Sequence, residues 1–279
     1  MNELQQVEFE ILKEFVAACD KLGLRYFLVC GSALGAVKYG GFIPWDDDVD
    51  VALPRRDYDR FCAEARALLP ERLFIQNHRT DPAFPPLYTK LRDRNTTFIE
   101  KTSRELPIVH GVYIDVFPLD GHPEGRLSGA VFELKKRICV AGVAAQFQLD
   151  SPVKRLLYTP FRLWTKLFPS PSFAARYEAL VRRYDPDSSA LWCNYGNSKL
   201  KLEYAPKEQY GEGREAVFEG LPVRVPGDFD AYLTQKYGDW RADLPPEQQV
   251  PHHFHVLCDL TRPYTEYRAE QTAGRTRAR

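Results

Sequence analysis

Four aspartates stand within five residues, at positions 46, 47, 48 and 50, directly before an apolar run. Charges of the same sign repel at this spacing: two unit charges ~4 Å apart interact by roughly 1 kcal/mol in water and about 4 kcal/mol at an effective dielectric near 20. A chain that folds around such a cluster needs a cation there. Carboxylate oxygens suit Mg²⁺ or Mn²⁺, and Mg²⁺ commonly meets carboxylates together with substrate phosphates. The cluster therefore predicts a divalent metal site beside a phosphate.

The segment Asp48–Leu53 alternates polar and apolar residues before it turns apolar, which predicts a strand that enters the core. Residues two apart on a strand share a face, so Asp48 and Asp50 should point the same way, with Cα atoms roughly 6.6 Å apart. Asp47 should point to the opposite face, and the direction of Asp46 stays open. We therefore predict that Asp48 and Asp50 form the centre of the metal site.

A second signal lies upstream, where an apolar run from Tyr26 to Cys30 ends in Gly31 and Ser32. Gly31 lets the backbone approach a ligand closely, and Ser32 can cap a helix that begins at Ala33. Backbone amides at such a helix start favour phosphate. Each signal alone has an ordinary explanation, a packing turn or a solvated acidic loop. Their combination predicts a metal-dependent phosphate site.

Charged residues on two later strands extend the candidate site. Asp115 is a lone acid in the apolar segment Gly111–Phe117, and a buried carboxylate needs a cation or a helix-terminus partner. A structural salt bridge is the alternative to a functional role. Lys90 and Arg92 lie two apart on a predicted strand, and with Lys38 they supply positive charge that suits phosphate oxygens.

The string from Gly31 to Asp50 resembles the LicD family, phosphotransferases related to the phosphocholine transferases of bacterial surface glycans and to the fukutin-type ribitol-phosphate transferases. Gly-Ser followed by Asp-x-Asp on the next strand is the signature of the nucleotidyltransferase fold. The similarity is most specific from Tyr26 to Tyr58. Further matches stand at Lys90–Asp93 and Tyr113–Asp120, and looser ones at Phe218–Gly220, Val225–Pro226 and Tyr237–Asp239.

The resemblance implies an α+β fold, with a nucleotidyltransferase-like mixed sheet flanked by helices and an additional mainly helical region. We expect a catalytic core over residues 1–125 and a helical region over 126–187. Residues 188–269 should form a C-terminal α+β part that completes the acceptor cleft. Residues 270–279, rich in Arg, Thr and Ala, are expected to be a disordered tail.

The resemblance also implies a reaction: transfer of a phosphoryl-alcohol group, most often phosphocholine, from a CDP-linked donor such as CDP-choline to a sugar hydroxyl of a cell-surface glycan. Mg²⁺ or Mn²⁺ would be held by Asp48, Asp50 and Asp115, with Asp115 as a metal contact or general base. The residues expected to bind the donor are Gly31, Ser32, Lys38, Lys90 and Arg92. Two alternatives remain open: a nucleotidyltransferase that attaches a whole nucleotide to a small molecule or other acceptor, and a catalytically silent binding protein.

Composition excludes several other classes. The 279 residues have a net charge of zero, so no basic excess points to nucleic acid. Six scattered cysteines without a Cys-x-x-Cys pair predict reduced core residues. The histidines at 252, 253 and 255 lack companion ligands for a zinc set, so we expect them to line the acceptor cleft.

Two features bear on the membrane. The N-terminus lacks an apolar signal region, and the longest apolar run, Ile138–Ala145, is too short to span a bilayer, so we expect a cytoplasmic protein. Basic and apolar residues interleave between Lys135 and Phe168. This stretch could rest peripherally on the inner face of the membrane, where a lipid-linked glycan acceptor would lie. Core helices with a solvated basic face are the alternative.

Overall fold

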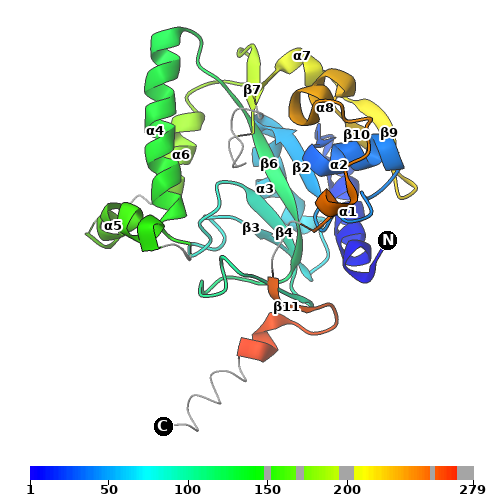
Figure 1. The fold of residues 1–279 in the computed structure, drawn as a ribbon, viewed down its shortest axis with the longest axis horizontal. Helices are drawn as coiled ribbons and strands as arrows, with labels where there is room; N and C mark the ends of the chain where they lie inside the picture. The colour runs from blue at the N-terminus through cyan, green and yellow to red at the C-terminus, as the bar shows by residue number, and fades with distance from the viewer. Residues whose placement is uncertain (148–151, 168–172, 195–203, 252–254, 269–279) are drawn as a thin grey trace.

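The computed structural model describes residues 1–147, 152–167, 173–194, 204–251 and 255–268. A mixed β-sheet with strand order β1-β2-β6-β4-β3 occupies the centre, and helices lie on either side of it (Figure 1). The predicted mixed sheet flanked by helices is therefore confirmed.

One parallel pair, β2 with β6, lies among otherwise antiparallel neighbours in this order. The sheet strands are β1 (Phe27–Leu28), β2 (Asp50–Pro54), β3 (Leu73–Gln76), β4 (Thr89–Asp93) and β6 (Val112–Gly121), extended by β7 (Leu191–Cys193) and β8 (Tyr204–Pro206). Two further antiparallel pairs are β9 (Arg214–Phe218) with β10 (Leu221–Val225), and β5 (Thr97–Glu100) with β11 (His255–Asp259).

The helices fall before, between and after these strands. The α-helices are α1 (Glu3–Leu22), α2 (Cys30–Leu34), α3 (Arg55–Glu64), α4 (Arg126–Ala144), α5 (Pro152–Leu167), α6 (Phe173–Val181), α7 (Lys207–Tyr210) and α8 (Phe229–Tyr237). Shorter turns are the π-helical η1 (Gly35–Tyr39) and the 3₁₀ segments η2 (Ala65–Ala67) and η4 (Pro246–Gln248). No helix in the described ranges is long and apolar enough to cross a membrane.

Helix α1 shows how local sequence sets an element. Asn2 and Gln5 form a reciprocal capping box at its start, and Gly23 ends it in the left-handed conformation, with φ 60°. Phe15 packs on Phe61 of α3, with ring centroids 5.0 Å apart, so the two helices join in one core.

Helices α4, α5 and α6 stand apart from this core, on the side of the sheet opposite α1 (Figure 1). Their inner faces form two smaller apolar clusters. In the first, Phe132 and Cys139 of α4 pack with Tyr177, Leu180 and Val181 of α6. The second joins Val143, Phe173 and Ala174.

Most predicted elements appear near their expected positions, with two corrections at the candidate site. The strand expected over 48–53 begins at Asp50, so Asp48 lies in the segment before it. The strand expected from Tyr26 to Cys30 shortens to Phe27–Leu28, because Cys30 already begins α2. The tail at 270–279 lies outside the described residues.

A buried ion pair joins α3 to β6. The Arg55 guanidinium donates to both carboxylate oxygens of Asp120, at 2.6 and 2.7 Å, and the Asp120 side chain is fully buried. Burial opposes the charge on Arg55, but Asp120 outweighs this and raises its pKa. Removal of Asp120 would therefore leave the buried Arg55 charge, among the described residues, with only its longer pair to Asp59, at 3.5 Å.

We expect Asp120→Ala to lower the free energy of unfolding by about 3–5 kcal/mol, because Arg55 remains buried. The matched control is Glu64→Ala, which breaks an exposed pair with Arg60 on the same helix and should cost no more than about 1 kcal/mol. Urea unfolding measures both. Equal, small losses would show that the buried pair contributes no more than the surface pair.

Candidate functional site

Three adjacent strands place predicted site residues in one row. Asp50 of β2 pairs with Asp115 of the parallel strand β6, and Asp115 pairs with Lys90 of β4. Residues paired across neighbouring strands share a face, so all three side chains point to the same side of the sheet. All three are largely buried, with 9%, 5% and 2% of their surface exposed. The Lys90 ammonium lies 3.2 Å from the Asp115 carboxylate.

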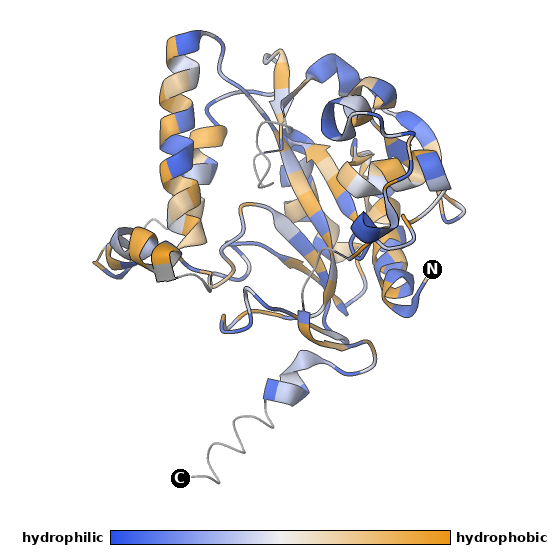
Figure 2. Ribbon diagram, in the orientation of Figure 1, coloured by the Kyte–Doolittle hydropathy of each residue, from blue (hydrophilic) through white to orange (hydrophobic). Residues whose placement is uncertain are grey.

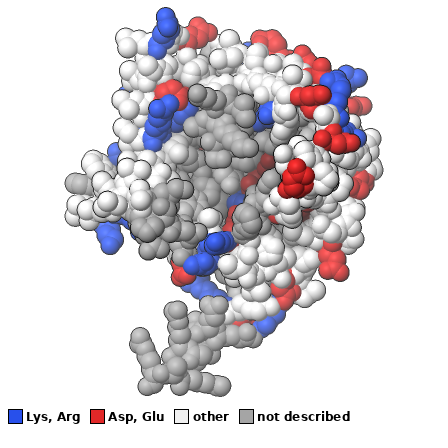
Figure 3. Space-filling model, in the orientation of Figure 1, with Lys and Arg blue, Asp and Glu red and all other residues white. Residues whose placement is uncertain are grey.

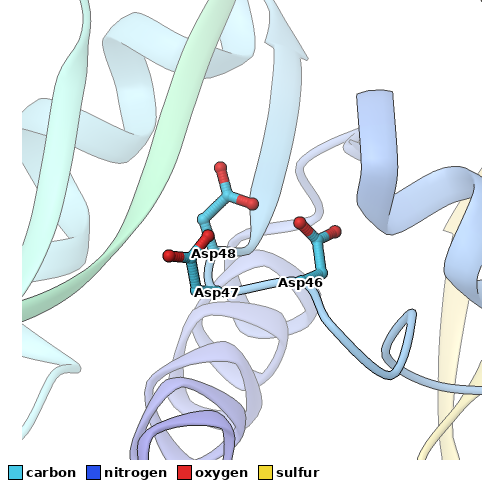
Figure 4. A group of neighbouring side chains, drawn as sticks. All are labelled: Asp46, Asp47 and Asp48. Carbon is cyan, nitrogen blue, oxygen red and sulfur yellow. The ribbon is translucent and has the colours of Figure 1, made fainter. Parts of the chain in front are cut away.

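The aspartates before β2 form the acidic part of the site. Asp46, Asp47 and Asp48 lie next to one another in the segment before β2 (Figure 4), and each offers an oxygen within 4.8 Å of those of the other two. The alternation of faces along a strand predicts that Asp47 faces away from Asp48. They lie instead in a non-strand segment, where the alternation of faces does not hold. The group is therefore wider than the predicted pair.

Electrostatics tie Asp50 to this group. Burial raises the pKa of Asp50 well above its usual range, and the charges of Asp48, Asp115 and Asp46 raise it further, while a hydrogen bond with Cys30 lowers it. Four carboxylates therefore act on one another here. A bound cation would reverse this unfavourable interaction, since its charge dominates any site that holds it. The chemistry of the donor set fits a hard divalent ion.

The turn after β1 is shaped around the aspartates. Cys30 has a φ of +52°, a left-handed conformation that is uncommon for a residue with a side chain. A Cβ atom on Gly31 would lie 2.6 Å from Oδ2 of Asp46, so any other residue here would force that carboxylate to shift. The Ser32 hydroxyl accepts a hydrogen bond from the Asp50 backbone N–H at 2.8 Å. Ser32 therefore fixes the start of β2 and does not cap a helix as expected.

Lys90 and Arg92 share a strand face as predicted, and both bind Glu100 on β5. Lys90 lies 3.3 Å from one oxygen of Glu100, and Arg92 lies 3.0 Å from the other. Burial would raise the pKa of Glu100, but the two cations lower it to about 2. The Arg92 side chain is fully buried and also donates to Gln76 and to the Gly111 carbonyl. In this structure Arg92 is therefore held by Glu100, Gln76 and the Gly111 carbonyl.

Lys38 and the predicted histidines are not members of the row formed by Asp50, Asp115 and Lys90. Lys38 forms an ion pair with Asp243 at 2.9 Å and donates to the Ala242 carbonyl at 2.8 Å, so its recorded contacts join η1 to a C-terminal segment. His252 and His253 lie outside the described residues. His255 of β11 packs on Phe98, with ring centroids 4.9 Å apart.

A cavity of about 200 Å³ opens beside Lys90. Aromatic walls come from Phe84, Tyr88 and Phe147, and polar groups come from Glu100 and Ser103. The buried Ser103 hydroxyl has no hydrogen-bond partner among the described residues. Figure 3 shows acidic and basic side chains close together in a recess of this face. The row of charges therefore adjoins space for a small polar ligand.

Glu8 is a candidate that sequence reasoning missed. It lies on the buried face of α1, one turn after Gln5, which donates to the Asp46 carbonyl oxygen at 2.9 Å. Its Oε2 is buried and has no hydrogen-bond partner among the described residues. Burial, followed by the charges of Asp48 and the other site aspartates, raises its pKa. The sequence feature that could have indicated Glu8 is its position between Leu4 and Leu12, on the apolar face of the helix.

Known proteins are similar to the part of the chain that holds Asp50, Asp115 and Lys90. Residues 23–126 match the family model described as LicD/FKTN/FKRP, nucleotidyltransferase domain, and this range contains every residue predicted to bind the metal or the donor. The chain is 28% identical over 267 residues to the lipopolysaccharide cholinephosphotransferase LicD of Haemophilus influenzae, which covers 91% of this chain and 96% of that protein. It is 38% identical over 71 residues to the ribitol 5-phosphate transferase FKRP of Homo sapiens, covering 24% of this chain and 14% of that protein.

We expect Glu8→Gln to stabilise the metal-free protein, and the gain to grow between pH 5 and pH 8. The raised pKa means that folded Glu8 keeps its proton above the pH at which the unfolded residue loses it. Wild-type stability therefore falls as pH rises through this window, and glutamine removes the loss. The expected gain at pH 8 is about 1 kcal/mol or more.

Urea unfolding in a chelator at both pH values measures the gain. The control is Glu10→Gln, an exposed residue on the same helix that pairs with Lys13 and should change stability by less than about 1 kcal/mol. A gain for Glu8→Gln that does not depend on pH would contradict the assigned electrostatics.

Proposed function

This chain belongs to the LicD family, and we propose that it is a metal-dependent transferase that moves a phosphoryl-alcohol group from a CDP-linked donor to a sugar hydroxyl of a cell-surface glycan. The two relatives of stated activity support this class of reaction. Their names describe a cholinephosphotransferase of lipopolysaccharide and a ribitol 5-phosphate transferase. Phosphocholine is the favoured group, because the relative aligned along most of the chain transfers choline phosphate by name.

The observation that carries the proposal is the row of Asp50, Asp115 and Lys90, with Asp48 beside it. Phosphoryl transfer requires little covalent chemistry from the protein, so catalysis consists of positioning and charge stabilisation. A row of acids that ends in a buried lysine supplies both kinds of charge on one sheet face. The alternative of a silent binding protein gives no reason for so many buried charges in one place.

Mg²⁺ or Mn²⁺ would be held by Asp48, Asp50 and Asp115, with Asp46 and Asp47 close by. When bound, the ion would supply positive charge to the donor diphosphate and to the leaving nucleotide. The fit rests on the oxygens of Asp46, Asp47 and Asp48, which lie within 4.8 Å of one another, and on the buried Asp50 carboxylate beside them. These are oxygen donors throughout, as hard cations prefer.

The transfer breaks the bond between the outer donor phosphorus and the bridging oxygen, and forms a bond from the sugar oxygen to that phosphorus. CMP leaves, and the sugar hydroxyl loses a proton. We assign Asp115 to the metal or to acceptance of this proton. Lys90 offers charge to the phosphoryl oxygens. The Gly31 and Ser32 amides, at the start of α2, are assigned to the leaving phosphate, and Arg92 is assigned to holding Glu100 in place.

The cavity beside Lys90 is the proposed site for the alcohol part of the donor. Four aromatic residues near the sequence motifs offer ring faces for a quaternary ammonium: Tyr39, Phe42, Trp45 and Tyr88. Of these, Tyr88 lines this cavity. Phe42 packs on Phe218 in the core, and Tyr39 and Trp45 pack on each other. Cation–π contact with Tyr88 and its aromatic neighbours would contribute ~0.5–2 kcal/mol each. Ribitol phosphate, glycerol phosphate or phosphoethanolamine would meet the same charged row.

Asp48→Ala should abolish turnover and leave the fold intact, because it removes a metal ligand and also relieves repulsion. We expect a loss of at least about 10³-fold, equivalent to roughly 4 kcal/mol of transition-state stabilisation. Calorimetry should show weakened Mn²⁺ binding, with an unchanged or higher melting temperature. Asp20→Ala, at the exposed end of α1, is the control and should leave both activity and metal binding unchanged. Substantial activity in Asp48→Ala would refute the metal assignment.

The phosphorus atom of CDP-choline that is attacked distinguishes the proposed transferase from the alternative, a nucleotidyltransferase. In water labelled with heavy oxygen, slow hydrolysis with Mg²⁺ should place the label in phosphocholine, because water takes the place of the sugar hydroxyl at the outer phosphorus. Mass spectrometry of both products reads the result. Label in CMP would favour transfer of the whole nucleotide. A panel of other CDP-alcohols under the same conditions identifies the preferred donor.

A further inference from the structure

Helix α4 has two apolar faces. Phe132, Cys139 and Val143 point inward and pack against α6. A second set recurs at helical spacing on the solvent side, with Leu127 80% and Leu134 62% exposed. A helix at the edge of a globular core normally has one apolar face and one polar face. The other exposed residues of this second apolar face of α4 are Val131 and Ile138.

Helix α5 continues this apolar surface. Leu156 is 77% and Leu167 70% exposed, and Trp164 is about half exposed. Ten of the eighteen large, exposed hydrophobic side chains among the described residues lie on α4 and α5, and Figure 2 shows the hydrophobic segments along both helices. Arg162 anchors α5 by donating to the carbonyl of Ala145, at 2.9 Å. A concentration of this kind marks an interaction surface.

The surface also carries positive charge. The sequence of α5 contains four basic residues and no acidic one. Between α4, α5 and α6 lies an open groove of about 720 Å³, lined by apolar residues that include Ile138 and Trp164. Its basic lining residues are Lys135, Arg176 and Arg183. Apolar side chains beside basic ones, with tryptophan among them, are typical of helices that lie in the interface of an anionic bilayer.

We propose that the solvent faces of α4 and α5, here called the α4–α5 surface, bind an anionic lipid surface. A second copy of the chain is a poorer occupant, because it would bring two basic faces together. An acidic membrane instead satisfies both the charge and the apolar side chains. This inference goes beyond the proposed transfer reaction, and its test requires no catalytic activity.

The test is flotation of the full chain with vesicles. We expect co-flotation with phosphatidylcholine vesicles that contain a third phosphatidylglycerol, and little with phosphatidylcholine alone. High salt should reduce the bound fraction, since it screens the headgroup charge. Trp164 fluorescence should shift to the blue on binding, and Trp164→Phe should remove most of the shift. No flotation on anionic vesicles, or equal flotation on both kinds, would overturn the proposal.

Two variants separate the lipid contact from general stickiness. Leu163→Glu/Leu167→Glu should lower the bound fraction at least about tenfold, because it places charge in the apolar face. Lys135→Glu/Lys166→Glu, which keeps the apolar residues, should lower it by a similar factor. The control is Leu68→Glu/Val217→Glu, which changes exposed hydrophobic residues elsewhere and should bind as wild type. Loss in the control equal to that in both test variants, or a concentration-dependent dimer abolished by them, would contradict the proposal.

Discussion

Backbone pairing between β2, β6 and β4 holds Asp50, Asp115 and Lys90 in line, and every other part of the site is arranged around that line. Successive side chains on a strand point to opposite faces, so a slip of one residue in any of these strands would turn its charged group into the core. The Ser32 hydroxyl, which accepts from the Asp50 N–H, fixes β2 at its first residue. The site is therefore a property of strand register as much as of its loop.

The charges of the site fall into two groups. In the first, Glu100 forms ion pairs with Lys90 and Arg92, so that a carboxylate and two cations lie together in a largely buried position. In the second group, around Asp50, the aspartates outnumber the cations, and Glu8 adds a further buried carboxyl from α1. Such an arrangement stores unfavourable electrostatic energy in the metal-free chain, which the large apolar core offsets. A divalent ion would remove most of this cost.

Local patterns predicted the strands around Phe27, Asp50 and Asp115, because hydrophobic periodicity lies within each segment. They also brought Asp50, Asp115 and Lys90 into one candidate site. The start of β2 was misplaced, since alternating residues look alike in a strand and in the extended segment before it. The burial of Arg92 depends on Glu100 and Gln76, which reach it from other strands. No local pattern reveals such partners, and Glu8 was overlooked for the same reason.

The parallel pair of β2 and β6 has a consequence for how the molecule is assembled. Strands β3, β4 and β5 lie between the two along the chain, and a parallel connection cannot close as a tight hairpin. Contacts of this sequence separation form late, because the intervening chain must first be ordered. A nascent polypeptide that has emerged only as far as β4 would carry the aspartates at 46–50 without Asp115. The candidate site is thus completed only when β6, the last of its three strands along the chain, pairs between β2 and β4.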